Sequence, residues 1–161
     1  MARKSREEKY PNTNTFHYYN ANPKNRITGD CVFRAFSFAM SQDYNKTVME
    51  MAELMCNTGY ALNDSKGEAK YLELKGWTKH QQPKKSNGTK YTGKEFCEKI
   101  ADKNKRYIAH IGGHHVVAIV NGKVHDTWNS TDGCIGNYWT KEWLMWRLEF
   151  LPVSFFICVL V

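Results

Sequence analysis

The feature that most constrains this sequence is a pair of runs rich in β-branched residues, joined by Asn121-Gly122. Asn-Gly between two such runs is typical of a two-residue hairpin turn, because both central residues of that turn adopt positive φ angles. The pattern predicts strands over residues 114–120 and 123–128. Further strands over 106–111 and 135–139 would extend the hairpin into an antiparallel sheet.

The hairpin register decides which side chains share a face. With a two-residue turn, Val120 lies opposite Lys123, and the pairing then continues toward the open ends of the strands. Directly opposed residues share a face, so His115 and Asp126 become diagonal neighbours, roughly 5.5–8 Å apart at the backbone. A carboxylate at that distance can reach an imidazole. His114 is predicted to point to the opposite face.

A turn at Gly29 places Cys31 at the beginning of a mostly apolar helical run over residues 32–40. The first turn of a helix has unpaired N–H groups and a partial positive charge, which lower the pKa of a cysteine there. The same amides can hold an oxyanion. An inert core thiol is the alternative, because cysteine is among the most often buried residue types.

These three side chains together predict a catalytic site. An imidazole backed by a carboxylate is fixed in one tautomer and stabilised when it takes a proton. If Cys31 approaches the other ring nitrogen of His115, the set has a nucleophile, a general base and an orienting acid, which is Asp126. The alternative is an ordinary sheet histidine beside a hairpin-end carboxylate.

The remaining elements complete the predicted fold class. Asp43 and Gly59 bound a second helix, a third covers residues 67–75, and the capping-box sequence 92–95 opens a fourth. Residues 78–91 are predicted to be a surface loop. We therefore expect an α+β domain in which a helical N-terminal half packs on a C-terminal antiparallel sheet.

Size and charge limit the classes of partner. The 161 residues suit one catalytic domain, which we assign to residues 25–140 after a polar arm over 1–24, itself with a short strand near residues 16–19. A net charge of +7 would suit an acidic partner such as nucleic acid. The lysines are scattered, however, so we interpret the charge as a solvated surface.

The cysteines and the two ends of the chain suggest a location. Five cysteines, widely spaced and without a Cys-x-x-Cys pair, favour a reducing compartment. The charged first residues lack a secretory pattern, so a cytoplasmic location is expected. The apolar segment over residues 141–161 contains too short an apolar run to span a bilayer, and we expect it to pack on the domain; an interfacial or partner-binding segment is the alternative.

The order of these motifs resembles the papain-like cysteine peptidases, over about residues 25–139. The matching parts are Gly29-Asp30-Cys31 and the run His115-Val116-Val117-Ala118 leading to Asp126. The resemblance is closest to the compact bacterial and phage-type members, including the double-glycine-leader peptidases. It implies a papain-like fold, a protein or peptide substrate, and cleavage of a peptide, isopeptide or amide bond through a thioester, without a cofactor.

The resemblance also implies an oxyanion hole beside the thiol. Such families place a glutamine before the cysteine to complete the oxyanion hole, and the matching position here is Asn25, with Asn22 as the alternative. From the residues themselves, Trp128 and Trp139 are predicted to wall the substrate cleft, and Gly113 would leave room for a substrate backbone.

Two other classes of function are weighed against a cysteine hydrolase. A non-enzymatic binding protein on a papain-like scaffold would keep the fold, since fold does not determine function. A metal-dependent nuclease would use histidines and a cysteine of the second half. Adjacent strand residues face opposite sides, which argues against a shared ion, so we expect no metal. The histidines and cysteine concerned are His110, His114, His115, His125 and Cys134.

Overall fold

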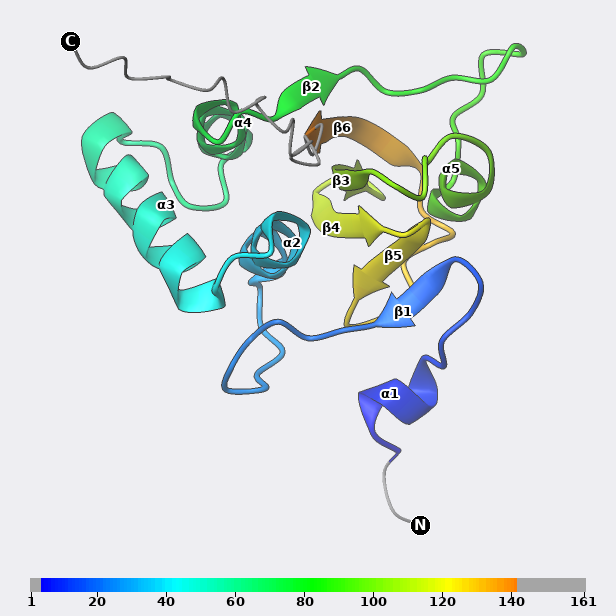
Figure 1. Ribbon diagram of the computed structural model, residues 1–161, viewed down its shortest axis with the longest axis horizontal. Helices are drawn as coiled ribbons and strands as arrows, with labels where there is room; N and C mark the ends of the chain where they lie inside the picture. Colours follow the sequence, from blue (N-terminus) through cyan, green and yellow to red (C-terminus); the bar gives the residue numbers. More distant parts are fainter. Residues whose placement is uncertain (1–3, 142–161) are drawn as a thin grey trace, which may run out of the picture.

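The computed structural model describes residues 4–141 and contains a six-stranded mixed sheet with helices on its faces (Figure 1). The predicted apolar segment after residue 141 lies outside the described residues. The strands are β1 (Phe16–Tyr18), β2 (Thr78–His80), β3 (Arg106–Ile111), β4 (His115–Val120), β5 (Lys123–Asp126) and β6 (Ile135–Lys141). The helices are α1 (Arg6–Lys9), α2 (Cys31–Met40), α3 (Tyr44–Thr58), α4 (Ser65–Leu74) and α5 (Gly93–Lys99). The α+β class is confirmed.

The predicted hairpin is confirmed as β4 and β5. Asn121 and Gly122 have φ angles of 53° and 69°, as a two-residue turn of this type requires. Val120 pairs with Lys123 in the predicted register. The second strand ends at Asp126, earlier than predicted.

The sheet departs from the wholly antiparallel one that the sequence predicts. Its strand order is β1-β5-β4-β3-β6-β2, and β1 runs parallel to β5 at one edge. At the other edge, β2 pairs with β6, although its residues fall within the predicted surface loop. Both edge strands have three residues and come from the N-terminal part of the chain. Their pairing is with distant segments, so no local pattern could reveal it. Residues 16–18 of the predicted arm thus belong to the sheet.

Two hydrophobic cores lie on opposite faces of the sheet. Val116 and Ala118 of β4 pack in a cluster with α2, α3 and α4. Val117 and Ile119, which alternate with them, pack on the other face against Phe96 of α5. Because β4 is buried on both faces, its sequence is a nearly continuous apolar run. The packing of β4 against α2 fixes the position of this helix on the sheet.

The ends of α3 and the start of α5 follow the predicted signals, whereas α4 begins at Ser65, two residues earlier than predicted, because Asp64 caps it. The side chain of Asp43 accepts a hydrogen bond from the amide of Lys46, and Gly59 ends α3 with a φ of 74°. Thr92 and Glu95 form the predicted capping box at the start of α5. These caps satisfy backbone groups that would otherwise lack partners, so they fix where each helix begins and ends.

A charged cluster joins the helical layer and leads to a first prediction. Glu50 of α3 accepts hydrogen bonds from Tyr71 at 2.6 Å and Gln42 at 2.9 Å, and it pairs with Lys75 at 2.7 Å. Burial alone would raise the pKa of Glu50, but these partners lower it to about 2. A carboxylate with a depressed pKa stabilises the fold above its unfolded pKa, and this contribution is lost as pH falls toward 2.

We therefore expect Glu50→Gln to lower the free energy of unfolding by about 1 kcal/mol at pH 7, since this partly exposed pair is screened by solvent. The difference from the parent protein should shrink between pH 4.5 and pH 3. Urea denaturation at pH 4.5 and at pH 3 measures this difference. Glu53→Gln, an exposed change on the same helix, is the control. An equal loss at both pH values would contradict the assigned role of the charge.

Candidate active site

The thiol of Cys31 lies at the first residue of α2, where the helix is left without a side-chain cap. Asp30 occupies the N-cap position, yet its side chain makes no capping hydrogen bond. It pairs instead with Arg34, one turn into the helix. The side chain of Asp30 therefore leaves the first amides of α2 available, and the backbones of Val116 and Val32 help to lower the pKa of Cys31.

His115 and Asp126 come together because of the hairpin register. His115 is the first residue of β4 and Asp126 the last of β5, so antiparallel pairing places these strand ends beside each other. The Nε2 atom of His115 lies 2.6 Å from Oδ2 of Asp126. The predicted contact between imidazole and carboxylate is thus confirmed.

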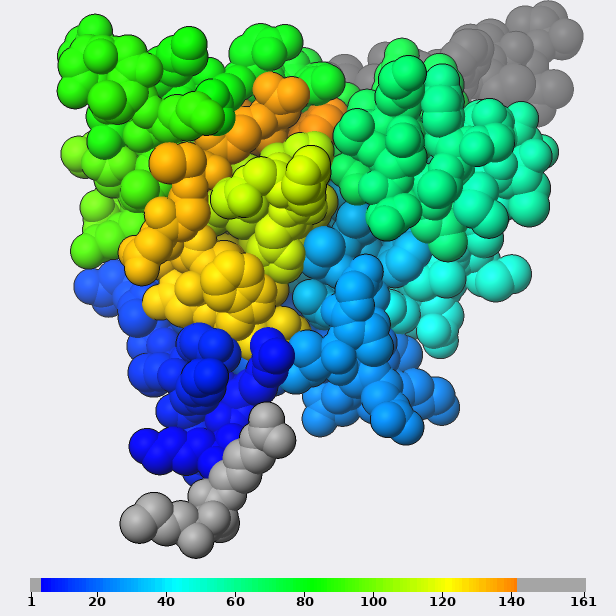
Figure 2. Space-filling view, turned by 180° about the vertical axis from the view of Figure 1, so that it is seen from behind, coloured from blue at the N-terminus to red at the C-terminus, as the bar shows by residue number. Residues whose placement is uncertain are grey.

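Cys31 reaches the same imidazole from the helical layer. The segment that enters α2, light blue in Figure 2, lies against the yellow-green and yellow segments that include β4 and the chain after β5. The Cys31 thiol and the His115 imidazole lie close enough for each to shift the pKa of the other through hydrogen bonding and charge. Since Nε2 of His115 is engaged by Asp126, the ring nitrogen left for the sulfur is Nδ1.

The carboxylate of Asp126 is buried and well supplied with donors. It is 4% exposed. Its Oδ2 atom accepts a second hydrogen bond from Ser130 at 2.9 Å, and Oδ1 accepts one from the amide of Thr127 at 2.7 Å. Charge-assisted hydrogen bonds of this kind fix the orientation of a carboxylate, and through it the orientation of the imidazole.

The electrostatics favour a thiolate paired with an imidazolium. Burial alone would raise the pKa of Cys31, but the hydrogen bond and charge of His115 lower it below the usual value. Burial alone would lower the pKa of His115, whereas Asp126 and Cys31 raise it to about 9. The ring of Trp128 lies 5.3 Å from that of His115 and is 38% exposed, so it covers one side of the imidazole.

The two amides predicted as oxyanion donors are placed less favourably. The amide oxygen of Asn25 accepts from Asn20 at 3.2 Å, and Asn25 is exposed with a φ of 52°. Asn22 donates to Asp30 at 2.9 Å. The hydrogen bonds seen for these two amides therefore go to other residues than the nucleophile. Gly113 lies in the exposed turn before β4, with open space around it.

Trp139 requires a correction. It was predicted to wall the cleft, but it is 2% exposed and belongs to the core that the sheet shares with α2, α3 and α4. Its position in the middle of the β2, β6 and β3 pairing explains this, because a large apolar side chain there is covered by the helical layer. The ring packs edge-on against His110 rather than against His115.

Sequence reasoning missed two polar residues beside the triad. Arg34 is 7% exposed, and its Nη2 atom lies 3.9 Å from Oδ1 of Asp126. The signal for it was a charged residue inside an otherwise apolar helical run, since a buried charge needs a partner. Ser130 follows the hairpin without any pattern that could have identified it.

The histidines weighed as alternative metal ligands have different surroundings. His110 bonds to Glu68 at 2.9 Å, and His114 is exposed in the turn before β4. Burial lowers the pKa of His125 to about 4, and its ring packs 4.4 Å from Phe38. Within residues 4–141, no group of three or more His, Cys, Asp or Glu side chains could hold a metal ion.

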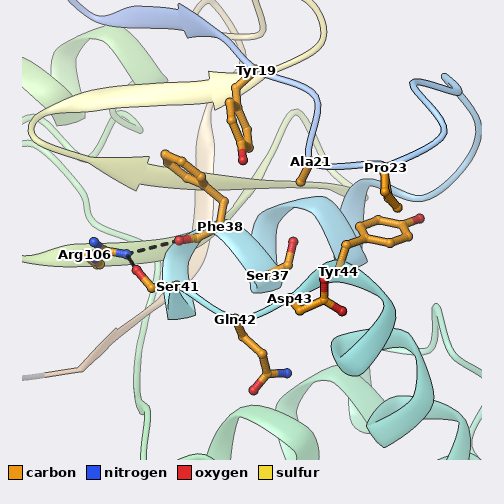
Figure 3. Close-up of a pocket in the computed structure, with 10 residues that line it drawn as sticks. All are labelled: Tyr19, Ala21, Pro23, Ser37, Phe38, Ser41, Gln42, Asp43, Tyr44 and Arg106. Atoms are coloured by element: carbon orange, nitrogen blue, oxygen red, sulfur yellow. Dashed lines mark hydrogen bonds between the residues drawn. The ribbon is translucent and has the colours of Figure 1, made fainter.

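A cavity of about 410 Å³ lies away from the thiol, beside the second half of α2 (Figure 3). Tyr19 and Phe38 form part of its wall, and their rings pack against each other with centroids 4.3 Å apart. Tyr44 forms another part of its wall, and its hydroxyl donates to Asp30 at 2.8 Å. The cavity thus borders the hydrogen-bond network behind the triad but does not open onto Cys31.

The fold and site together define an α+β protein in which a cysteine lies beside a hydrogen-bonded histidine and aspartate pair. Comparison of the chain with models of protein families, with curated proteins and with solved structures finds no match in any of the three. None of the helices within residues 4–141 combines the length and apolar character needed to cross a bilayer.

Proposed function

We propose that this protein is a cysteine-dependent hydrolase that cleaves a peptide, isopeptide or amide bond. The observation that supports the proposal most directly is the position of His115, which is hydrogen-bonded to Asp126 and close enough to Cys31 for the two side chains to shift each other's pKa. That arrangement supplies an activated nucleophile, a general acid and base, and an orienting acid. The resemblance to papain-like peptidases agrees with it.

The chemistry would proceed in two halves. The Cys31 thiolate attacks the substrate carbonyl carbon, and a C–S bond forms while the negative charge moves to the oxygen. Amides in the first turn of α2 can donate to this oxyanion. The imidazolium of His115 then gives its proton to the leaving nitrogen, the C–N bond breaks, and a thioester with the free amine remains.

Water completes the cycle. His115, now neutral, takes a proton from a water molecule, whose oxygen attacks the thioester carbon. The C–S bond breaks, the substrate leaves as a carboxylic acid, and the thiolate and imidazolium are restored. No oxidant, metal or other cofactor enters this balance. Asp126 stays ionised throughout and stabilises the charged imidazole.

Labelling with an electrophilic thiol probe, followed by peptide mapping, tests the nucleophile. At pH 7 we expect Cys31 to be modified at least tenfold faster than exposed Cys56, because an ordinary thiol is only a few per cent ionised there. Cys97 should react slowest, since burial raises its pKa to about 12. Equal and slow labelling of all three would contradict an activated thiol.

Hydrolysis itself is tested with a peptide mixture in ¹⁸O-labelled water. We expect ¹⁸O in newly formed carboxylates with the parent protein and none with Cys31→Ala. This readout also detects side-chain deamidation, because both reactions add water to an acyl group. Fast labelling of Cys31 without ¹⁸O incorporation would contradict the hydrolase and favour a binding protein on this scaffold.

A further inference from the structure

We infer that Arg34 is a positioning residue that holds Asp126 in the orientation required by His115, a role that rests on the proposed function. Arg34 lies three residues after Cys31 in α2. Residues at this spacing share a helix face one turn apart, so one rigid helix carries both the nucleophile and the cation beside the triad acid. The helix would therefore set the position of both ends of the triad.

The guanidinium bridges two buried carboxylates with different nitrogen atoms. Its Nη1 atom pairs with Asp30, and its Nη2 atom lies 3.9 Å from Asp126. The second distance is an ion pair rather than a hydrogen bond. All three side chains are less than 10% exposed, so solvent screens their charges weakly. An ammonium group is a single point of charge and cannot span both partners in this way.

Asp30 is in turn held by residues other than Arg34. Its Oδ2 atom accepts hydrogen bonds from Asn22 at 2.9 Å and from Tyr44 at 2.8 Å. An aspartate at an N-cap normally bonds its own helix, but here it is committed to Arg34. This has two consequences: the guanidinium is fixed, and the side chain of Asp30 does not occupy the first amides of α2.

The charges balance around the triad acid. Asp126 faces the cations His115 and Arg34, while Asp30 offsets the second positive charge. An arginine without Asp30 would compete with the imidazolium for the same carboxylate. Asp126, Tyr44, Arg6 and Tyr18 act electrostatically on Arg34, and Asp30 pairs with it directly.

The test is the pH dependence of Cys31 alkylation by iodoacetamide in the Arg34→Lys variant. This variant keeps the positive charge but loses the planar guanidinium with its two Nη atoms. We expect the rate at pH 6 to fall about tenfold and the rate at pH 10 to change less than twofold. Arg106→Lys is the matched control, because Arg106 also binds α2, through the carbonyls of Phe38 and Ala39. Its profile should match the parent's.

The outcomes separate this role from the proposed function. If the parent thiol is activated and Arg34→Lys lowers only the melting temperature, Arg34 is a structural brace and the inference fails. If the parent thiol reacts like an ordinary cysteine at pH 6, the proposed function fails, and the role of Arg34 with it. Thermal unfolding followed by circular dichroism shows which variants are folded.

A second measurement applies if Arg34→Lys does not fold. Nitrogen-15 NMR of the Arg34 guanidinium, in the parent protein and in the Asp126→Asn variant, reports on the contact between Arg34 and Asp126. Here the carboxylate is changed and the arginine is kept. We expect the Nη–H resonances of Arg34 to shift when the carboxylate becomes an amide. Unchanged resonances would overturn the inference.

Discussion

His115→Ala is expected to slow the alkylation of Cys31 by iodoacetamide at pH 7 by roughly 10- to 100-fold. In the parent protein the imidazolium lowers the pKa of Cys31 against the opposing effect of burial. Without it, burial is the first remaining influence, and the thiol should be mostly protonated at pH 7. The higher intrinsic nucleophilicity of a more basic thiolate offsets part of this loss.

The control for that prediction is His114→Ala. His114 precedes His115 directly but is exposed in the turn, so its loss should change the rate less than twofold. Peptide mapping of the alkylated protein keeps the measurement specific to Cys31. At pH 10, where an ordinary thiol also ionises, the rates of the His115→Ala variant and the parent should approach each other. A larger effect of His114→Ala than of His115→Ala would refute the assigned base.

The second large effect is on stability. We expect Phe36→Ala to lower the free energy of unfolding by about 3–5 kcal/mol. Phe36 is 1% exposed and stacks on Tyr71, with ring centroids 5.7 Å apart and an angle of 4° between the planes. Removal of the ring leaves a cavity between α2 and α4 that these packed elements can close only in part.

Chemical denaturation at pH 7 measures this loss, and Leu74→Ala is its control. Leu74 lies on α4 but is 64% exposed, so its truncation should cost less than about 0.5 kcal/mol. Because Phe36 belongs to the helix that carries Cys31, the alkylation rate of the Phe36→Ala variant shows how far helix packing supports the site. Similar losses for the two variants would contradict the core assignment.

The local parts of the site were predictable because short-range rules govern them. Asn121-Gly122 fixed the turn, and the two-residue alternation of strands then brought His115 and Asp126 together. The position of Cys31 at a helix start followed from the glycine turn and the apolar run after it. The oxyanion prediction for Asn25 had no such support, and its amide oxygen bonds Asn20 instead.

By itself, the sequence determined the hairpin, its register, the caps of α3, the capping box of α5 and the start of α2, because each depends on residues only a few positions apart. The tertiary structure decided that Cys31 meets His115, that β1 and β2 close the two edges of the sheet, and that Arg34 lies beside Asp126. Those contacts join segments far apart in the chain. They form only when the burial of both faces of β4 offsets the entropy of closing the long loops between them.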